Sequence, residues 1–268
     1  MENRPSPRLR SVDLRELWAY RELAGFLALR DLKVRYKQAA FGVAWAIFQP
    51  LAGVVVFTIV FRRLASVASD GIPYPVFAFV GLTVWAYASS SVTKATQSLV
   101  SNAALVTKVY FPRVVVPLAA VLPGLLDFAV ALPVLGILWA VYGVTPTWAL
   151  LTLPLWVTAV VVVAFAVGLL LSALNVRYRD VSQAITLFIQ LWLFLSPVAY
   201  PSSSVPAGWR PLYALNPMSG VIDGFRWALV GGPAPGPWLL LSGLVTVVLL
   251  ATGVVYFQRT ERQFADVI

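Results

Sequence analysis

The sequence predicts an all-α integral membrane protein with six transmembrane helices, an N-terminal amphipathic helix at the membrane surface and short re-entrant helices on the outer face. Hydrophobic residues make up 60% of the 268 residues and charged residues only 12%, whereas soluble domains average about 45–50% and about 25%. Uncharged runs long enough to cross a bilayer recur along the chain. Most Lys and Arg residues lie before and between these runs. Together these observations exclude an ordinary soluble domain.

Each span is placed on an uncharged stretch, because about 20 apolar residues cross about 30 Å of hydrocarbon at about 1.5 Å per residue. Positions 38–61 and 71–93 contain no charge and hold one span each. Residues 128–176 are also uncharged and hold parts of two spans, separated by a turn at Gly143 and Pro146. The predicted spans are residues 42–62, 75–93, 114–141, 148–174, 182–200 and 237–257.

The distribution of Lys and Arg predicts that both ends of the chain face the cytoplasm. Six spans place both ends on one side of the membrane, and 16 of the 20 Lys and Arg residues then lie on that side. Cytoplasmic segments carry the excess of cations in membrane proteins. The net charge of +9 is explained in this way and does not indicate a nucleic-acid partner. The first 12 residues have no apolar core, so no cleavable signal peptide is expected.

Residues 13–38 predict a helix that lies along the inner membrane surface before the first span. Asp13 is placed to cap this helix, with Glu16 at its third position and Leu17 and Trp18 on an apolar face. In the second half of the segment the charges spread around the helix, so the amphipathic pattern is imperfect. Two interpretations stay open: a basic anchor to anionic lipid, and a docking surface for a partner.

Two further elements lie between the spans. Residues 94–113 are too short and too polar to cross the membrane, and residues 97–107 form either a cytoplasmic helix of about three turns or a solvated connector. On the outer side, Asn216 and Pro217 mark a helix start, because Asn is a preferred N-cap and Pro a preferred first residue. Residues 209–230 are therefore expected to form a helical hairpin that dips into the membrane, with a loop packed on the outer surface as the alternative.

Asp127 is the one ionisable residue that lies clearly inside a predicted span. A charge at that depth is costly, so its side chain is expected to face the bundle interior and to find a partner. It is either part of a transport pathway or a hydrogen-bonded structural residue. Proton-coupled carriers usually hold several buried ionisable groups, so a passive or partner-driven pathway fits this chain better.

The composition excludes several kinds of active site. The chain has no Cys and no His, so thiol catalysis, imidazole catalysis and the common zinc sites lack their side chains. Acidic residues outside the spans are scattered singly, so no metal site is expected. No phosphate-binding loop of the form G-x-x-x-x-G-K-[ST] occurs, so energy would come from another chain. We therefore expect a transport protein without enzymatic activity or a cofactor of its own.

Five segments, in their order along the chain, carry a resemblance to a known protein family. They are RDLKVRYKQAAFGVAWAIFQPL at 30–51, LVSNAALVTKVYFPR at 99–113, LSALNVRYRDV at 171–181, SPVAYP at 196–201 and LYALNPMSGVIDGFRWAL at 212–229. Together they resemble the transmembrane permease subunits of bacterial type-2 ABC exporters for polysaccharides, the group that exports O-antigen, capsular polysaccharide and teichoic acid. The match covers about residues 14–257.

The resemblance implies a homodimer of six-span permeases in the bacterial cytoplasmic (inner) membrane, each paired with a cytoplasmic ATPase that binds ATP and Mg²⁺. The implied substrate is a glycan on undecaprenyl diphosphate. Residues 13 to about 25 would form an interface helix against the ATPase, residues 97–108 a coupling helix, and residues 209–230 the outer gate helices. The coupling positions are Gln97, Ser98, Ser101, Asn102 and Lys108, and the gate positions are Trp209, Tyr213, Asn216, Pro217, Phe225 and Arg226.

A glycan that passes through such a subunit needs flat apolar faces, and its diphosphate needs cations at the inner entrance. The aromatic candidates are Trp45, Phe48, Phe57, Phe188, Trp192 and Phe194, and the cationic candidates are Arg30, Lys33, Arg35 and Lys37. Alternatively, the rings face lipid or the core, and the cations hold membrane lipid headgroups. For the function as a whole, the alternatives are an exporter of a lipid or drug, an envelope-glycan enzyme and a structural scaffold.

Overall fold

The computed structural model describes residues 14–37, 44–178, 180–261 and 264, most of which are helical. In chain order the elements are α1 (Leu14–Ala19), α2 (Arg21–Lys37), α3 (Ala44–Phe57), the π-helix η1 (Thr58–Leu64), α4 (Tyr74–Ser101), α5 (Ala103–Lys108), α6 (Val115–Val121), α7 (Gly124–Tyr142), the 3₁₀ turn η2 (Trp148–Thr152), α8 (Leu153–Arg177), α9 (Val181–Leu195), the 3₁₀ turns η3 (Ser202–Ser204) and η4 (Ala207–Trp209), α10 (Arg210–Tyr213), α11 (Pro217–Val230) and α12 (Trp238–Thr260). No strand occurs among these residues, so the all-α prediction is confirmed.

Five helical stretches are long and apolar enough to cross a membrane. They are Ile47–Leu64, Tyr74–Ser101, Val115–Tyr142, Trp148–Arg177 and Trp238–Thr260, which correspond to the first four predicted spans and the last. The remaining predicted span, 182–200, is occupied by α9. Its 15 residues rise about 22 Å, less than the roughly 30 Å of a hydrocarbon core. A sixth crossing would need residues beyond α9 and stays a prediction.

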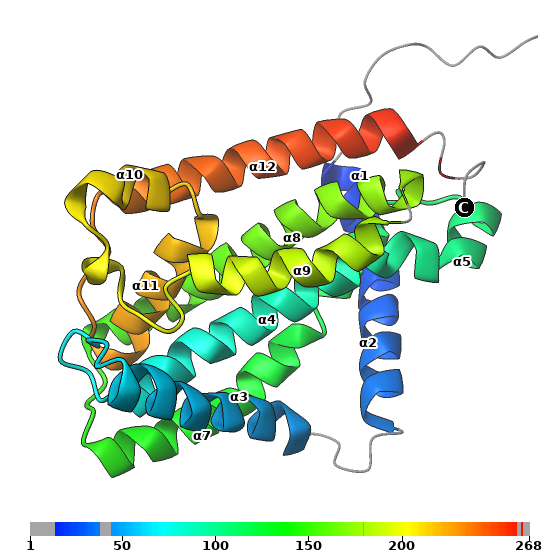
Figure 1. Cartoon of the computed structure of the whole chain (residues 1–268). Helices are drawn as coiled ribbons and strands as arrows, with labels where there is room; N and C mark the ends of the chain where they lie inside the picture. The colour runs from blue at the N-terminus through cyan, green and yellow to red at the C-terminus, as the bar shows by residue number, and fades with distance from the viewer. Residues whose placement is uncertain (1–13, 38–43, 179, 262–263, 265–268) are drawn as a thin grey trace, which may run out of the picture.

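The two ends of the bundle carry different elements (Figure 1). At one end, here called the α5 end, α1, α2, α5 and the C-terminal end of α12 come together. At the opposite end, the α10 end, lie α10 and the loops that flank α11. α2 crosses the long direction of α4 and α8 steeply, as a helix on a membrane surface would. The helix predicted over 13–38 is divided into α1 and α2, and Asp13 lies outside the described residues.

Small residues let the central helices approach closely. α4 is buried along most of its length and packs against α8. A Cβ atom added to Gly168 of α8 would lie 2.5 Å from the Cβ of Ala95 on α4. A Cβ on Gly253 of α12 would lie 3.2 Å from the carbonyl oxygen of Ala166 on α8. Membrane helices associate through such close contacts, because lipid supplies no hydrophobic drive between them.

A smaller apolar cluster fastens α2 to the bundle. Ala24 and Leu27 of α2 belong to the same buried cluster as Val116 of α6 and Phe257 of α12. The apolar side of the predicted N-terminal helix is therefore partly a packing face within the chain. Trp18 of α1 is exposed instead.

The span predicted over 114–141 is divided into α6 and α7 beside Pro123. Pro ends the regular hydrogen bonding there, because it lacks an N–H group. The carbonyl of Val121 accepts hydrogen bonds from the Tyr87 hydroxyl at 3.1 Å and from Ser91 Oγ at 3.4 Å, both on α4. α7 then ends at Gly143, which has a positive φ of 67°, so the predicted turn at this position is confirmed.

α4 extends further than the predicted span 75–93. It continues to Ser101, so residues 97–101 belong to this long helix and only α5 is separate. No Pro or Gly interrupts the chain between 94 and 108, which explains why the helix persists past Lys94. The segment predicted as one coupling helix is therefore the end of α4 followed by a six-residue helix.

Candidate functional site

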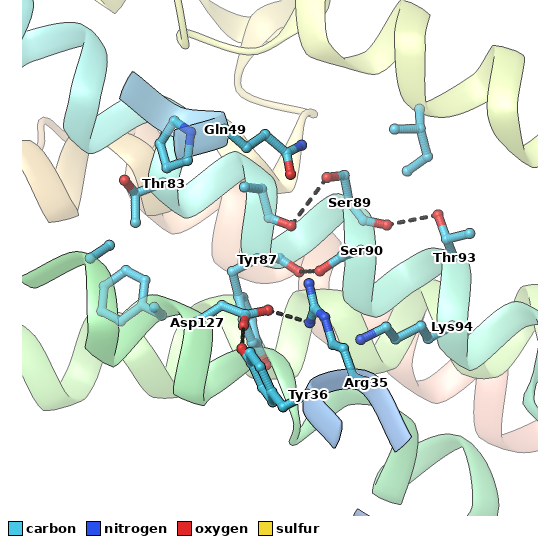
Figure 2. Close-up of a pocket in the computed structure, with 15 residues that line it drawn as sticks. Arg35, Tyr36, Gln49, Thr83, Tyr87, Ser89, Ser90, Thr93, Lys94 and Asp127 are labelled. Atoms are coloured by element: carbon cyan, nitrogen blue, oxygen red, sulfur yellow. Dashed lines mark hydrogen bonds and ion pairs between the residues drawn. The ribbon is translucent and has the colours of Figure 1, made fainter. Parts of the chain in front are cut away.

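A polar cavity of about 450 Å³ lies among α2, α3, α4, α7 and α9 (Figure 2). Its polar and charged lining residues are Arg35, Tyr36, Gln49, Thr83, Tyr87, Ser89, Ser90, Thr93, Lys94 and Asp127, and its apolar ones are Pro50, Ala86, Phe128, Ala131 and Ile189. Polar groups inside a membrane bundle are costly and commonly mark a substrate or ion pathway. The cavity is therefore the candidate functional site.

α4 contributes a row of hydroxyl groups to one wall of the cavity. Thr83, Tyr87, Ser90 and Thr93 recur every three to four residues, the spacing of one helix face. Ser90 Oγ donates to the Tyr87 carbonyl at 3.2 Å, and Thr93 Oγ1 donates to the Ser89 carbonyl at 2.8 Å. The hydroxyl oxygens keep lone pairs that accept further hydrogen bonds. Sequence reasoning missed this row, although its spacing is visible in the sequence.

Asp127 lies in the first turn of α7 and lines the cavity. Its carboxylate accepts hydrogen bonds from Arg35 Nη1 and from the Tyr36 hydroxyl, both near the end of α2, and Arg35 also forms an ion pair with it (Figure 2). Burial and the hydrogen bond to Asp127 raise the pKa of Tyr36 to about 12, so its hydroxyl remains a donor at neutral pH. Asp127 thus has the partners that its position requires.

The cations of this region lie in different surroundings. Among the four predicted at the entrance, only Arg35 lines the cavity. Lys33 and Lys37 are exposed on α2. Lys94 of α4, which sequence reasoning did not select, lines the cavity and points toward the pair of Arg35 and Asp127 (Figure 2). Two cations against one carboxylate leave this wall with an excess of positive charge.

The fourth predicted entrance cation, Arg30, connects two helices. Its guanidinium donates to Asp31 Oδ1 at 3.0 and 2.8 Å and to Asn102 Oδ1 at 2.8 Å. Asn102 stands between α4 and α5, and its Nδ2 donates to the carbonyl of Ser98 at 2.8 Å. The contact joins α2 to the predicted coupling segment. Arg30 is not among the residues that line the cavity.

The other predicted coupling positions lie on both sides of Asn102. Gln97 and Ser101 belong to the last turns of α4, and Lys108 ends α5. Gln97 and Lys108 are exposed at the α5 end, whereas Ser98 is buried and bonds to the Ala95 carbonyl. The exposed side chains form part of the molecular surface at the α5 end.

Three of the aromatic candidates lie on exposed faces of α3 and α9, two helices that also contribute residues to the cavity. Phe188 and Phe194 of α9 are 43% and 63% exposed, and Phe48 of α3 is also exposed. α4 contacts both α3 and α9 and lies between them (Figure 1). The hydroxyl row on α4 is thus flanked on two sides by helices that carry exposed apolar and aromatic side chains.

The remaining aromatic candidates lie elsewhere. Trp192 is only 7% exposed, its Nε1 donates to Asn216 Oδ1 at 2.8 Å, and its ring meets that of Trp85 edge to face at 5.5 Å. It therefore supports the fold in this conformation and does not line an open surface. Phe57 is partly buried against the core. Trp45 lies in α3, and its side chain is outside the described residues.

The predicted outer hairpin consists of α10 and α11. Asn216 caps α11, accepting from the backbone N–H of Met218 at 3.0 Å, and Pro217 is the first helical residue, so the predicted helix start is confirmed. Trp209 is exposed at the tip, and Tyr213 is partly buried. The deeper predicted gate residues, Phe225 and Arg226, are both buried.

Comparisons with known proteins agree with this architecture. Residues 22–230 match the ABC-2 type transporter family. The O-antigen export system permease protein RfbA of Myxococcus xanthus is 32% identical over 264 residues, covering 95% of this chain and 98% of the relative. An RfbA of Klebsiella pneumoniae is 30% identical over 243 residues, covering 89% and 92%. The polysialic acid transport protein KpsM of Escherichia coli is 22% identical over 237 residues, covering 88% and 92%.

Proposed function

We propose a polysaccharide export function for this chain, which belongs to the ABC-2 type transporter family. It is the transmembrane permease subunit of an ATP-driven exporter that moves a glycan of the O-antigen or capsule type, carried on undecaprenyl diphosphate. The similarity to permeases named for O-antigen export supports this cargo. The observation that carries the proposal is the hydroxyl-lined cavity, because a sugar chain needs hydrogen-bond partners inside an apolar bundle.

The working assembly contains two copies of this chain and two copies of a cytoplasmic ATPase that holds ATP and Mg²⁺. The 268 residues contain no phosphate-binding loop, so a second protein supplies the energy. Exposed Lys33, Lys37 and Lys108 at the α5 end support a cytoplasmic orientation of that end. Both ends of the chain then face the cytoplasm, and the chain lies in the cytoplasmic membrane.

The glycan passes along the face that α3, α4 and α9 share, with the same face of the second copy closing the path. Hydroxyls of α4 such as Ser90 bond to the sugar hydroxyl groups, while the rings of Phe188 and Phe194 give flat surfaces along which sugar C–H faces slide. Arg35 and Lys94 attract the diphosphate at the inner part of this path.

Single-cysteine variants test the assembly, because the natural chain has no cysteine. Lys108→Cys lies on the exposed end of α5, and Leu212→Cys, its matched control, is exposed at the α10 end. Each variant is expressed in the native host, crosslinked with a thiol-to-amine reagent in intact membranes and affinity-purified. Mass spectrometry then identifies the attached proteins and the copurified lipid.

We expect an ATPase with a phosphate-binding loop on the Lys108→Cys variant alone, together with undecaprenyl-linked glycan. If neither variant is recovered with an ATPase, the result would contradict the exporter and favour an envelope enzyme or a scaffold. An ATPase accompanied by a lipid or drug and no glycan would keep the transporter and contradict its cargo.

A further inference from the structure

A second cavity, of about 300 Å³, lies at the α10 end of the bundle. The loop before α4, the outer hairpin and the start of α12 enclose it, and it shares no lining residue with the first cavity. Its size is at the lower end of small-molecule pockets, which run from about 300 to about 1,000 Å³. It can hold a single ring and not an extended chain.

Arg226 of α11 lines this cavity and is held firmly in place. Its side chain is 4% exposed, its guanidinium carbon lies 3.4 Å from the centre of the Phe77 ring, and its Nη2 donates to the Val198 carbonyl at 2.9 Å. Gly81 leaves the space that the guanidinium occupies, because a Cβ there would lie 2.8 Å from Nη2. Thus the contacts from α4 and the 196–199 segment fix the position of this charge.

Two donors of Arg226 lack an acceptor in the part of the chain that the structure describes. Among the described residues, neither Nε nor Nη1 has a hydrogen-bond partner, although both atoms are buried. Buried polar groups are nearly always hydrogen-bonded, and an unpaired charged donor is especially costly. Arg226 thus brings a fixed guanidinium with two unused donors to the lining of the cavity. Both donor atoms are themselves covered, so a ligand that supplies acceptors reaches them by displacing the groups that cover them.

The charges around the cavity favour an uncharged ligand. Asp70 and Asp223 line it together with Arg210 and Arg226, so two carboxylates balance two guanidinium groups. A phosphate or diphosphate would meet both carboxylates and gain little. Hydroxyl groups, in contrast, accept from a guanidinium and donate to a carboxylate at the same time. The ring of Trp238, which also lines the cavity, offers a flat apolar face.

We propose that this outer cavity binds one uncharged sugar ring of the exported glycan. Arg226 donates to the ring hydroxyls, Asp223 accepts from them, and Trp238 packs on a C–H face. The inference rests on the proposed function and adds to it a sugar-specific site on the outer side, separate from the translocation path.

Binding of free sugars to the purified chain in lipid nanodiscs tests the site without an ATPase or export. The probes are D-glucose, D-galactose, D-mannose, L-rhamnose and N-acetyl-D-glucosamine, with inorganic phosphate and pyrophosphate as anionic comparisons, measured by saturation-transfer NMR. Gly236→Trp adds a large side chain at a position that lines the cavity, and a Cβ there meets no atom within 4 Å, so the substitution obstructs the cavity without a clash at Cβ. Asp223→Asn keeps the shape and removes one charge. Arg63→Gln, an exposed cation at the same end outside the cavity, is the matched control.

We expect saturable binding of at least one neutral sugar, lost in Gly236→Trp, weakened about tenfold or more in Asp223→Asn and unchanged in Arg63→Gln. Absence of binding by every sugar, or binding that Gly236→Trp leaves intact, would overturn the proposal. Binding of phosphate or pyrophosphate alone would replace it with an anion site. Because no partner is present, a negative result here leaves the exporter proposal standing, and a missing ATPase in the crosslinking experiment leaves this site standing.

Discussion

Asn216 joins the end of α9 to the start of α11 through both ends of its amide, and its removal should measurably destabilise the protein. Its Oδ1 accepts from Trp192 Nε1 at 2.8 Å and from the Met218 N–H at 3.0 Å. Its Nδ2 donates to the Leu195 carbonyl and to Ser196 Oγ, both at 2.9 Å. One side chain therefore caps α11 and supplies hydrogen-bond partners for a buried indole N–H and for the last carbonyl of α9.

The magnitude follows from the bonds that are lost. Asn216→Ala removes an N-cap, worth about 1 kcal/mol, and leaves the indole N–H of Trp192 buried without a partner, a penalty of about 1–3 kcal/mol. We expect a total destabilisation of about 2–4 kcal/mol. Trp192→Phe loses one hydrogen bond and keeps an aromatic ring against Trp85, so it should cost about 1–2 kcal/mol. The double variant should fall short of the sum by about 1 kcal/mol or more, because no indole is then left unpaired.

Unfolding of the purified variants in mixed micelles, followed by far-ultraviolet circular dichroism during an SDS titration, measures these differences. Trp209→Phe is the matched control, because this tryptophan lies exposed in the same hairpin and should change stability by less than about 0.5 kcal/mol. An Asn216→Ala variant as stable as this control, or additive effects of the two substitutions, would refute this role of Asn216. If Trp192 lined a channel, its replacement would lower export without changing the unfolding curve.

Two further sets of substitutions test the cavity wall and the helix packing. The side chains of Arg35 and Asp127 are 37% and 19% exposed, so their ion pair is intermediate between surface and buried pairs. Arg35→Gln should therefore lower the free energy of unfolding by about 1–2 kcal/mol, and adding Asp127→Asn should recover part of that loss. Equal unfolding curves for the single and the double variant would contradict this expectation. Gly168→Val forces a side chain against Ala95, where a Cβ would lie at 2.5 Å, and should cost about 1–3 kcal/mol or more. Gly136→Ala meets no atom within 4 Å and should be neutral or stabilising in the same titration.

Local signals in the sequence predicted the helix boundaries that depend on backbone chemistry. Gly143 ends α7 and Asn216 begins α11, because a left-handed cap and a side-chain N-cap act within a few residues. The end of α4 differs, since the prediction used the charge of Lys94 to end the span. A charge marks where a chain meets water or a polar cavity, and it does not stop a helix that lacks Pro or Gly.

The candidate site shows what one sequence can and cannot predict. The hydroxyl row on α4 is a local pattern that spacing alone could have identified. The contact between Arg35 and Asp127 joins residues far apart in the chain, and neither composition nor spacing indicates which cation pairs with the acid. Trp192 and Phe188 lie one turn apart on α9, yet one is buried and the other exposed. The two rings lie on the same side of the helix and contact each other at 5.2 Å, so what distinguishes them is that Trp192 meets Trp85 and Asn216, contacts that periodicity does not contain.

α2 connects the surface at α5, where the proposed ATPase partner would bind, to the wall of the cavity. Arg30 in α2 bonds to Asn102 at the α4–α5 junction, and Arg35, less than two turns further on, pairs with Asp127 at the cavity wall. A rigid helix 17 residues long cannot shift one of these contacts without moving the other. Force applied by a partner at α5 would thus reach the cavity through α2, while the buried and closely packed α4 resists bending. If the chain works as proposed, α2 can pass on such a force by exchanging its polar contacts, because these are hydrogen bonds at partly exposed residues.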